Sequence, residues 1–192
     1  MLTLIAIGAL QMANPAVQEP LLPGLGNHHR VVMTRSALAQ KYFDQGLNLL
    51  MAFNHDEARA SFQQAAKIDP RCAMAFWGIA TANGPHINNP IVDPAREAEA
   101  FNALRKARSL PTKRPVDRSL ILAASKRFAQ PQPASRAKLD EAYANAMRQV
   151  WANYPNDADI GSLFAESMMD LRPWDLWKAD GKPQPGTLEI VT

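Results

Sequence analysis

The four histidines are the side chains of this 192-residue chain that offer most for chemistry. His28 and His29 are adjacent in the sequence. His55 falls in an expected turn between two helices, and His86 follows the next helix, so we expect both to lie at one edge of a helical stack, about one helix-packing distance apart. With a third ligand, these histidines could hold a metal ion or a haem. The alternative is that the adjacent pair is solvated and that the turn histidines cap helices.

The spacing of the histidines and the cysteine content match no metal-binding motif. The sequence has no His-x3-His, Cys-x2-Cys or Cys-x2-Cys-His run. Its single cysteine, Cys72, excludes an intrachain disulfide and covalent haem attachment through a cysteine pair. Cys72 stands where a helix is expected to begin after Pro70, and we interpret it as a small buried residue rather than a nucleophile. We therefore expect no cofactor, and keep an accessory protein that binds metal or haem as the alternative hypothesis.

Enzyme motifs are also missing from the sequence. It contains no glycine-rich phosphate loop, no nucleophile elbow and no His-Glu-x2-His run. The acid pairs Asp56 with Glu57, and Asp157 with Asp159, fall at expected helix starts. Carboxylates are stabilised at a helix N-terminus without any catalytic role. The sequence therefore favours a binding protein over an enzyme.

A helical repeat is the strongest pattern in the chain. Six positions from 42 to 70 have the spacing of a tetratricopeptide repeat (TPR): Tyr42, Gly46, Ala58, Phe62, Ala65 and Pro70. The missing side chain at Gly46 lets a second helix approach closely, and Phe62 is the large ring of that helix's apolar stripe. Pro70 has no amide hydrogen and ends the hairpin. Gln45 departs from the consensus, which usually has leucine there.

The periodicity and the breakers predict further helices along the chain. We expect helices over about 36–51, 56–68, 72–83, 95–109, 116–128, 135–153 and 157–171, with another beginning at Thr187. The fold class is therefore all-α, a TPR-like right-handed solenoid of antiparallel helical hairpins with about seven helices. It should occupy residues 34–192, after a leader or extended lead-in over residues 1–33.

A concave groove is the expected binding surface of such a solenoid. The first helix of each pair lines it, and the inward candidates are Phe43, Leu47, Leu50, Met51, Trp77 and Thr81. This apolar set suggests a hydrophobic peptide, or the protein's own lead-in, as occupant. The alternative is that these residues are core between stacked hairpins. The sequence thus predicts a protein-interaction or scaffolding module whose partner is a protein or peptide.

In addition to the repeat spacing, the residue identities of several segments resemble those of one family. Segments 26–29, 42–47, 52–58, 72–80 and 84–88 are similar to a family of bacterial TPR proteins, mostly uncharacterised and often exported. The resemblance covers about residue 25 to the end. It implies a repeat fold and export but no established reaction. The family pattern would continue past Thr192, so the chain resembles an N-terminal portion.

The N-terminal run Leu2 to Leu10 bears on the compartment. It is apolar and short, and small residues follow at Ala13 and Ala16, as in a secretory signal, although a basic n-region is lacking. An N-terminal strand or helix that packs on the body is the alternative. We therefore expect a periplasmic or otherwise exported protein, with a cytoplasmic location as the alternative. No stretch is long enough to cross a bilayer as a helix.

Charge argues against nucleic acid as a partner. The formal net charge is only +3. A local basic run comprises Arg105, Lys106, Arg108, Lys113, Arg114, Arg118, Lys126 and Arg127. We interpret it as a solvated helix face rather than an anionic docking patch. No interleaved aromatic residues of the kind that stack bases accompany it.

The C-terminal hairpin is expected to be incomplete. Phe164 and Met168 belong to its first helix, while Thr187 to Thr192 is too short to complete the second. Because each repeat buries its apolar face only against a neighbour, this face should be uncapped. We therefore predict self-association through it, unless the loop with Trp174 and Trp177 folds back over it.

Overall fold

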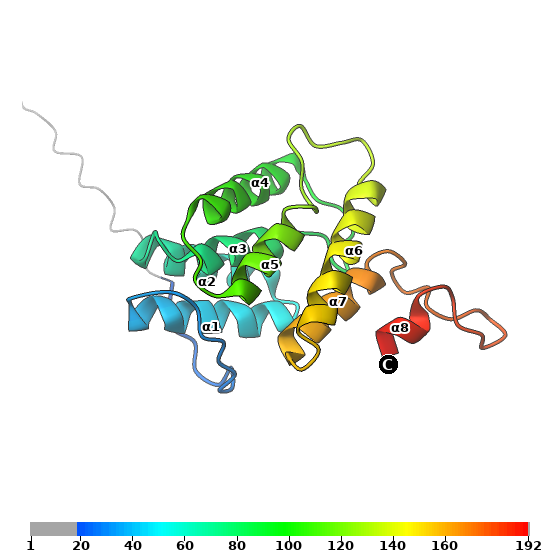
Figure 1. Ribbon diagram of the computed structural model, residues 1–192, viewed down its shortest axis with the longest axis horizontal. Coiled ribbons are helices and arrows are strands. Elements are labelled where there is room, and N and C mark those ends of the chain that lie inside the picture. The colour runs from blue at the N-terminus through cyan, green and yellow to red at the C-terminus, as the bar shows by residue number, and fades with distance from the viewer. Residues whose placement is uncertain (1–18, 192) are drawn as a thin grey trace, which may run out of the picture.

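The computed structural model describes residues 19–191, in which loops connect helices and no strand is formed (Figure 1). Its eight helices are α1 (Ala37–Met51), α2 (His55–Ile68), α3 (Ala73–Ala82), α4 (Pro94–Ser109), α5 (Pro115–Ala124), α6 (Ala137–Asn153), α7 (Ala158–Met169) and α8 (Thr187–Val191). The all-α prediction is confirmed, and α8 begins at Thr187, where the start of a further helix was expected. No helix in the described range is both long and apolar enough to cross a membrane. The predicted leader at Leu2 to Leu10 lies outside the described residues.

Each helix packs mainly on its neighbours in the sequence. α1 contacts α2, α3 contacts α4 and α6 contacts α7, while α2 also packs on α3. The first helices of successive pairs touch as well, since α3 contacts both α1 and α5. In Figure 1, α1 and α4 lie across the picture and α6 and α7 run steeply beside them. In this arrangement, α7 lies near the C-terminal ends of α1 and α3.

The first hairpin and α3 close around one aromatic ring. Phe62 of α2 is fully buried and lies 5.5 Å from the ring centroid of Phe43. A Cβ added at Gly46 of α1 would stand 2.8 Å from Phe62, and one added at Gly78 of α3 would stand 2.3 Å away. Both distances are shorter than carbon atoms tolerate. The two glycines therefore let one ring hold three helices together.

The lead-in lies against α1. The Tyr42 hydroxyl donates to the carbonyl of Glu19 at 2.5 Å. Gln45 is buried, and its side chain accepts from the amide of Leu22 at 2.7 Å and donates to the carbonyl of Pro20 at 2.9 Å. Both hydrogen bonds are partly buried, and a leucine at position 45 could make neither, so the two backbone groups of the lead-in would lose their partner on α1. This explains why the sequence departs from the repeat consensus at Gln45.

The first two helices begin differently. Ser36 is the N-cap of α1, and its hydroxyl accepts from the amide of Ala39. Asn54 precedes α2, but its side chain makes no capping hydrogen bond. The Asp69 carboxylate at the end of α2 instead accepts from the Thr34 hydroxyl at 2.5 Å. This bond ties the start of the first hairpin to its end.

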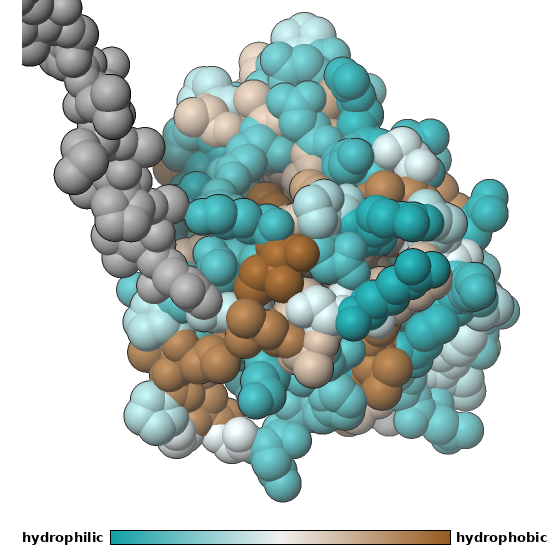
Figure 2. All heavy atoms as spheres, turned by 90° about the vertical axis from the view of Figure 1, so that its left-hand side faces the viewer, coloured by the Kyte–Doolittle hydropathy of each residue, from teal (hydrophilic) through white to brown (hydrophobic). Residues whose placement is uncertain are grey.

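The C-terminal face is covered, which corrects the expectation of an uncapped end. Phe164 and Met168 are buried, because α8 packs on α7 and an ion pair between Arg148 and Glu189 holds it there at 2.5 Å. The Trp174 side chain does not fold back, being 79% exposed, and Trp177 is exposed as well. Self-association remains a prediction, and these two indoles are the apolar groups on which it would depend. The opposite end of the molecule presents a largely hydrophilic surface with small apolar groups (Figure 2).

Candidate binding site

A pocket of about 590 Å³ opens between α1, α3 and α7. Its lining is mainly apolar and includes Leu50, Met51, Phe53, Ile87, Leu163 and Met169. The walls come from the end of α1, the turn after it, the end of α3 with the loop that follows, and one face of α7. The volume lies in the range typical of ligand-binding sites.

The six residues predicted to line a groove divide into two groups. Leu50, Met51 and Thr81 line the pocket. Phe43, Leu47 and Trp77 are almost completely buried in the core instead. These three turn inward because α2 and α3 approach α1 so closely at the two glycines that the space between the helices is filled. The interpretation of these positions as core therefore applies to half of the set.

His55 and His86 form a stacked pair at the edge of this pocket. Their ring centroids are 3.9 Å apart and the planes are inclined by 10°. The Phe53 ring meets both histidines edge-on, at 5.9 and 6.1 Å. His55 Nδ1 lies 3.0 Å from the carbonyl oxygen of Phe53. Because that oxygen can only accept, Nδ1 carries a proton, and Nε2 of the neutral ring is left as an acceptor.

Burial keeps this pair uncharged. It lowers the pKa of His55, and together with the neighbouring His55 and Arg127 it lowers the pKa of His86 to about 4. Of the other two histidines, His28 lines the same pocket and pairs with Asp159 at 2.8 Å, and His29 pairs with Asp44 at 2.7 Å. Within residues 19–191, no group of three or more histidine, cysteine or acidic side chains is placed to hold a metal ion. Cys72 is buried, which raises the pKa of its thiol to about 11.

We expect His86 to make the fold sensitive to acid. Its pKa is lower in the folded state than the ordinary value of about 6.5, so the folded protein resists taking up this proton. The stability that depends on neutral His86 is complete above about pH 6.5 and is lost as the pH falls toward 4. His86→Phe keeps a ring against His55 without the proton site. Melting temperatures between pH 7 and 4.5 should fall less steeply in this variant, and parallel curves would contradict the assignment.

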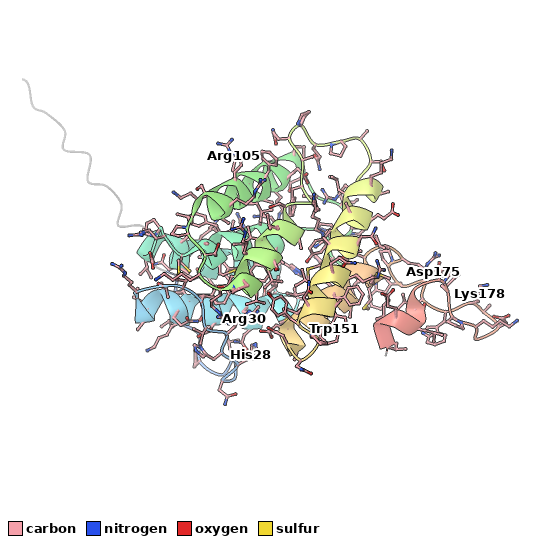
Figure 3. The ribbon with its side chains drawn as sticks, in the orientation of Figure 1. His28, Arg30, Arg105, Trp151, Asp175 and Lys178 are labelled. Atoms are coloured by element: carbon pink, nitrogen blue, oxygen red, sulfur yellow. The ribbon has the colours of Figure 1, made fainter. Side chains whose placement is uncertain are left out.

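Arg30 ties the lead-in to the start of α7. Its side chain is 6% exposed and donates to Asp157 and Asp159 at 2.9 Å each. His28 reaches Asp159 from the same segment, and Figure 3 shows His28 and Arg30 together beside α1. The two acids expected at the start of α7 therefore both bind the lead-in, and Asp157 also caps the helix by accepting from the amide of Ile160. No local pattern marks Arg30, because its partners are 127 and 129 positions away.

A buried arginine lies at the floor of the pocket. Arg127 is 2% exposed, pairs with Asp170, lies 3.8 Å from Asp140 and stacks on the Tyr143 ring at 4.6 Å. This corrects its interpretation as part of a solvated basic face. α5 ends at Ala124, short of the expected 128, and the chain beyond it turns inward. A sequence pattern could not distinguish Arg127 from its exposed neighbours in the basic run.

Acidic groups outnumber basic ones around Arg127. Arg136 joins the same network, pairing with Glu97 and lying 3.4 Å from Asp140. Two guanidinium groups thus face the carboxyl groups of Glu97, Asp140, Asp170 and Glu166. Burial and the neighbouring Asp170 raise the pKa of Glu166 to about 7, against the pull of Arg127. Burial likewise raises the pKa of Asp170 to about 6.

Glu166 is the acid of this network that lines the pocket. Among residues 19–191, no hydrogen-bond partner is found for its carboxyl group, and Arg127 donates to Asp170 instead. A carboxyl group in a mainly apolar wall is expected to have a donor nearby. Nothing in the sequence marked Glu166, since it stands in an ordinary amphipathic helix.

Comparisons with known proteins identify no relative of this chain. No family model, no curated protein and no solved structure matches the chain.

Proposed function

We propose that the protein is a TPR-like binding module that holds an apolar segment of a partner protein in the pocket between α1, α3 and α7. The observation that carries the proposal is the origin of the lining: α1, α3 and α7 are each the first helix of a pair. Solenoids of helical hairpins use these helices for their concave binding surface. The packing of each helix on its sequence neighbours also fits a repeat architecture.

The chemistry of the lining favours binding over catalysis. Apolar side chains dominate it, and most of its polar groups are already engaged with the protein itself. The resemblance to exported bacterial TPR proteins fits a binding role, and export is part of the same proposal. A metal or haem bound through the histidines is the competing hypothesis. Elemental analysis and a visible absorption spectrum of protein purified without a histidine tag would test it.

A random peptide library tests the proposed function. We expect the protein to select apolar peptides, and Met51→Gln and Met169→Gln to weaken their binding about tenfold, which corresponds to about 1.4 kcal/mol. Both methionines line the pocket and are only partly buried, so circular dichroism and melting should change little. Leu122→Gln is the matched control, since Leu122 is exposed and lies outside this pocket. Peptides that bind all variants equally, or no selection at all, would overturn the proposal.

A further inference from the structure

We propose that the bound segment carries a lysine or arginine whose charged group is received by Glu166. The inference rests on the proposed function and specifies the kind of peptide that the pocket recognises. It starts from the Glu166 carboxyl group, which lines the pocket without a hydrogen-bond partner in the described chain. Glu166 is partly exposed in the free protein, and an apolar segment bound in the pocket would cover it. Burying a polar group without a partner costs free energy, so a donor on the ligand is favoured at this place.

The donor should be cationic, because the network behind this wall has more acidic than basic groups. Two arginines face four carboxyl groups there, Glu166 is the one of the four that lines the pocket, and the guanidinium of Arg127 is already held by Asp170 and stacked on Tyr143. A bound ammonium or guanidinium would reduce this excess, and a charge-assisted hydrogen bond is stronger than a neutral one. An anionic group would meet Glu166 and Asp159 with no free guanidinium to compensate them.

The rest of the pocket suits the stem of a basic side chain. Leu50, Met51 and Met169 can cover its methylene groups. Phe53 is 43% exposed on the same wall and offers a ring face to a cation. Burial lowers the pKa of His55, so that ring is neutral and its free Nε2 can only accept a hydrogen bond. None of these groups repels a positive charge.

Peptides selected from the library provide the first test. We expect them to contain one lysine or arginine flanked by apolar residues. Replacing the basic residue with norleucine, which keeps the stem and removes the charge, should weaken binding at least tenfold. In Glu166→Gln, the lysine and norleucine peptides should bind within about twofold of each other, as measured by fluorescence anisotropy. Glu141→Gln is the control, since Glu141 lies on the exposed face of α6 and should preserve the preference.

Stability distinguishes lost recognition from lost folding. The raised pKa of Glu166 means that its ionised form opposes folding above about pH 7. The charged and titratable groups that act on it are Arg127, Asp170 and Tyr143, and His28, His55 and Asp159 line the same pocket. Glu166→Gln removes one charge from the acidic excess, so at pH 8 its melting temperature should equal or exceed that of the parent. Its loss of the lysine preference would then report recognition alone.

Each outcome decides between the two proposals. Pocket-dependent peptides without a basic residue would overturn the role of Glu166 and leave the binding module intact. If the preference for lysine persists in Glu166→Gln, the cation binds elsewhere. This result would also overturn the role of Glu166 and leave the binding module intact. Peptides whose binding ignores Met51→Gln and Met169→Gln would overturn both proposals together.

Discussion

Replacing Arg127 with methionine is expected to cost about 3 to 5 kcal/mol of folding free energy at pH 8, because removing one partner of a buried ion pair leaves the other uncompensated. Arg127 is the cation closest to Asp170, and it also lies near Asp140 and Glu166. Without it, three carboxyl groups share a site whose remaining cation is Arg136. Chemical denaturation of Arg127→Met should give a much lower midpoint than that of the parent.

Lys126→Met is the matched control for this variant. Lys126 is the adjacent residue, has the same charge and is exposed, so its replacement should change stability by less than about 0.5 kcal/mol. Acid should reduce the cost of Arg127→Met, because the pKa values of Asp170 and Glu166 are already raised and both groups are protonated below about pH 5. If Arg127→Met and Lys126→Met have the same denaturation midpoint at pH 8, the network contributes nothing to folding.

Much of the helical framework could be predicted because its signals are local. Apolar periodicity and the breakers around Pro70, Gly84 and Pro155 place helices within a few residues of those observed. The error at the end of α5 has a physical cause. Arg127 is part of a basic run and Phe128 continues an apolar pattern, so a sequence reading extends the helix through both. Pairing with Asp170 and burial among the neighbouring helices determine their actual positions.

The candidate site could be predicted only where helical register determines it. Leu50, Met51 and Thr81 lie on helices whose faces follow from the repeat spacing. The roles of Arg30 and Glu166 depend on groups that only the fold brings near them. Arg30, for example, pairs with Asp157, which is 127 positions away. A single sequence contains no local signal for such pairs. At Gln45 the departure from the consensus marked an unusual position, but it did not identify the partners, which depend on the position of the lead-in.

Introducing leucine at Gly46 is expected to cost about 1 to 3 kcal/mol, although leucine favours the helix by up to about 1 kcal/mol over glycine. The Cβ alone would stand 2.8 Å from the Phe62 ring. Phe62 cannot move away, since it is fully buried and the backbone of Gly78 lies close to the same ring. Overpacking therefore outweighs helix propensity at this position.

A double-mutant cycle with Phe62→Leu separates the clash from other effects of the substitution. The smaller side chain should leave room for the new one, so the combined variant should be more stable than the sum of the single changes predicts, by about 1 kcal/mol or more. Thermal melts of the four proteins measure this coupling, and Gly78→Ala, which meets the same ring at 2.3 Å, should show it as well. Strictly additive costs would mean that Phe62 does not limit the approach of α1 and α3. In that case the repeat register proposed for the first hairpin would lose its main physical support.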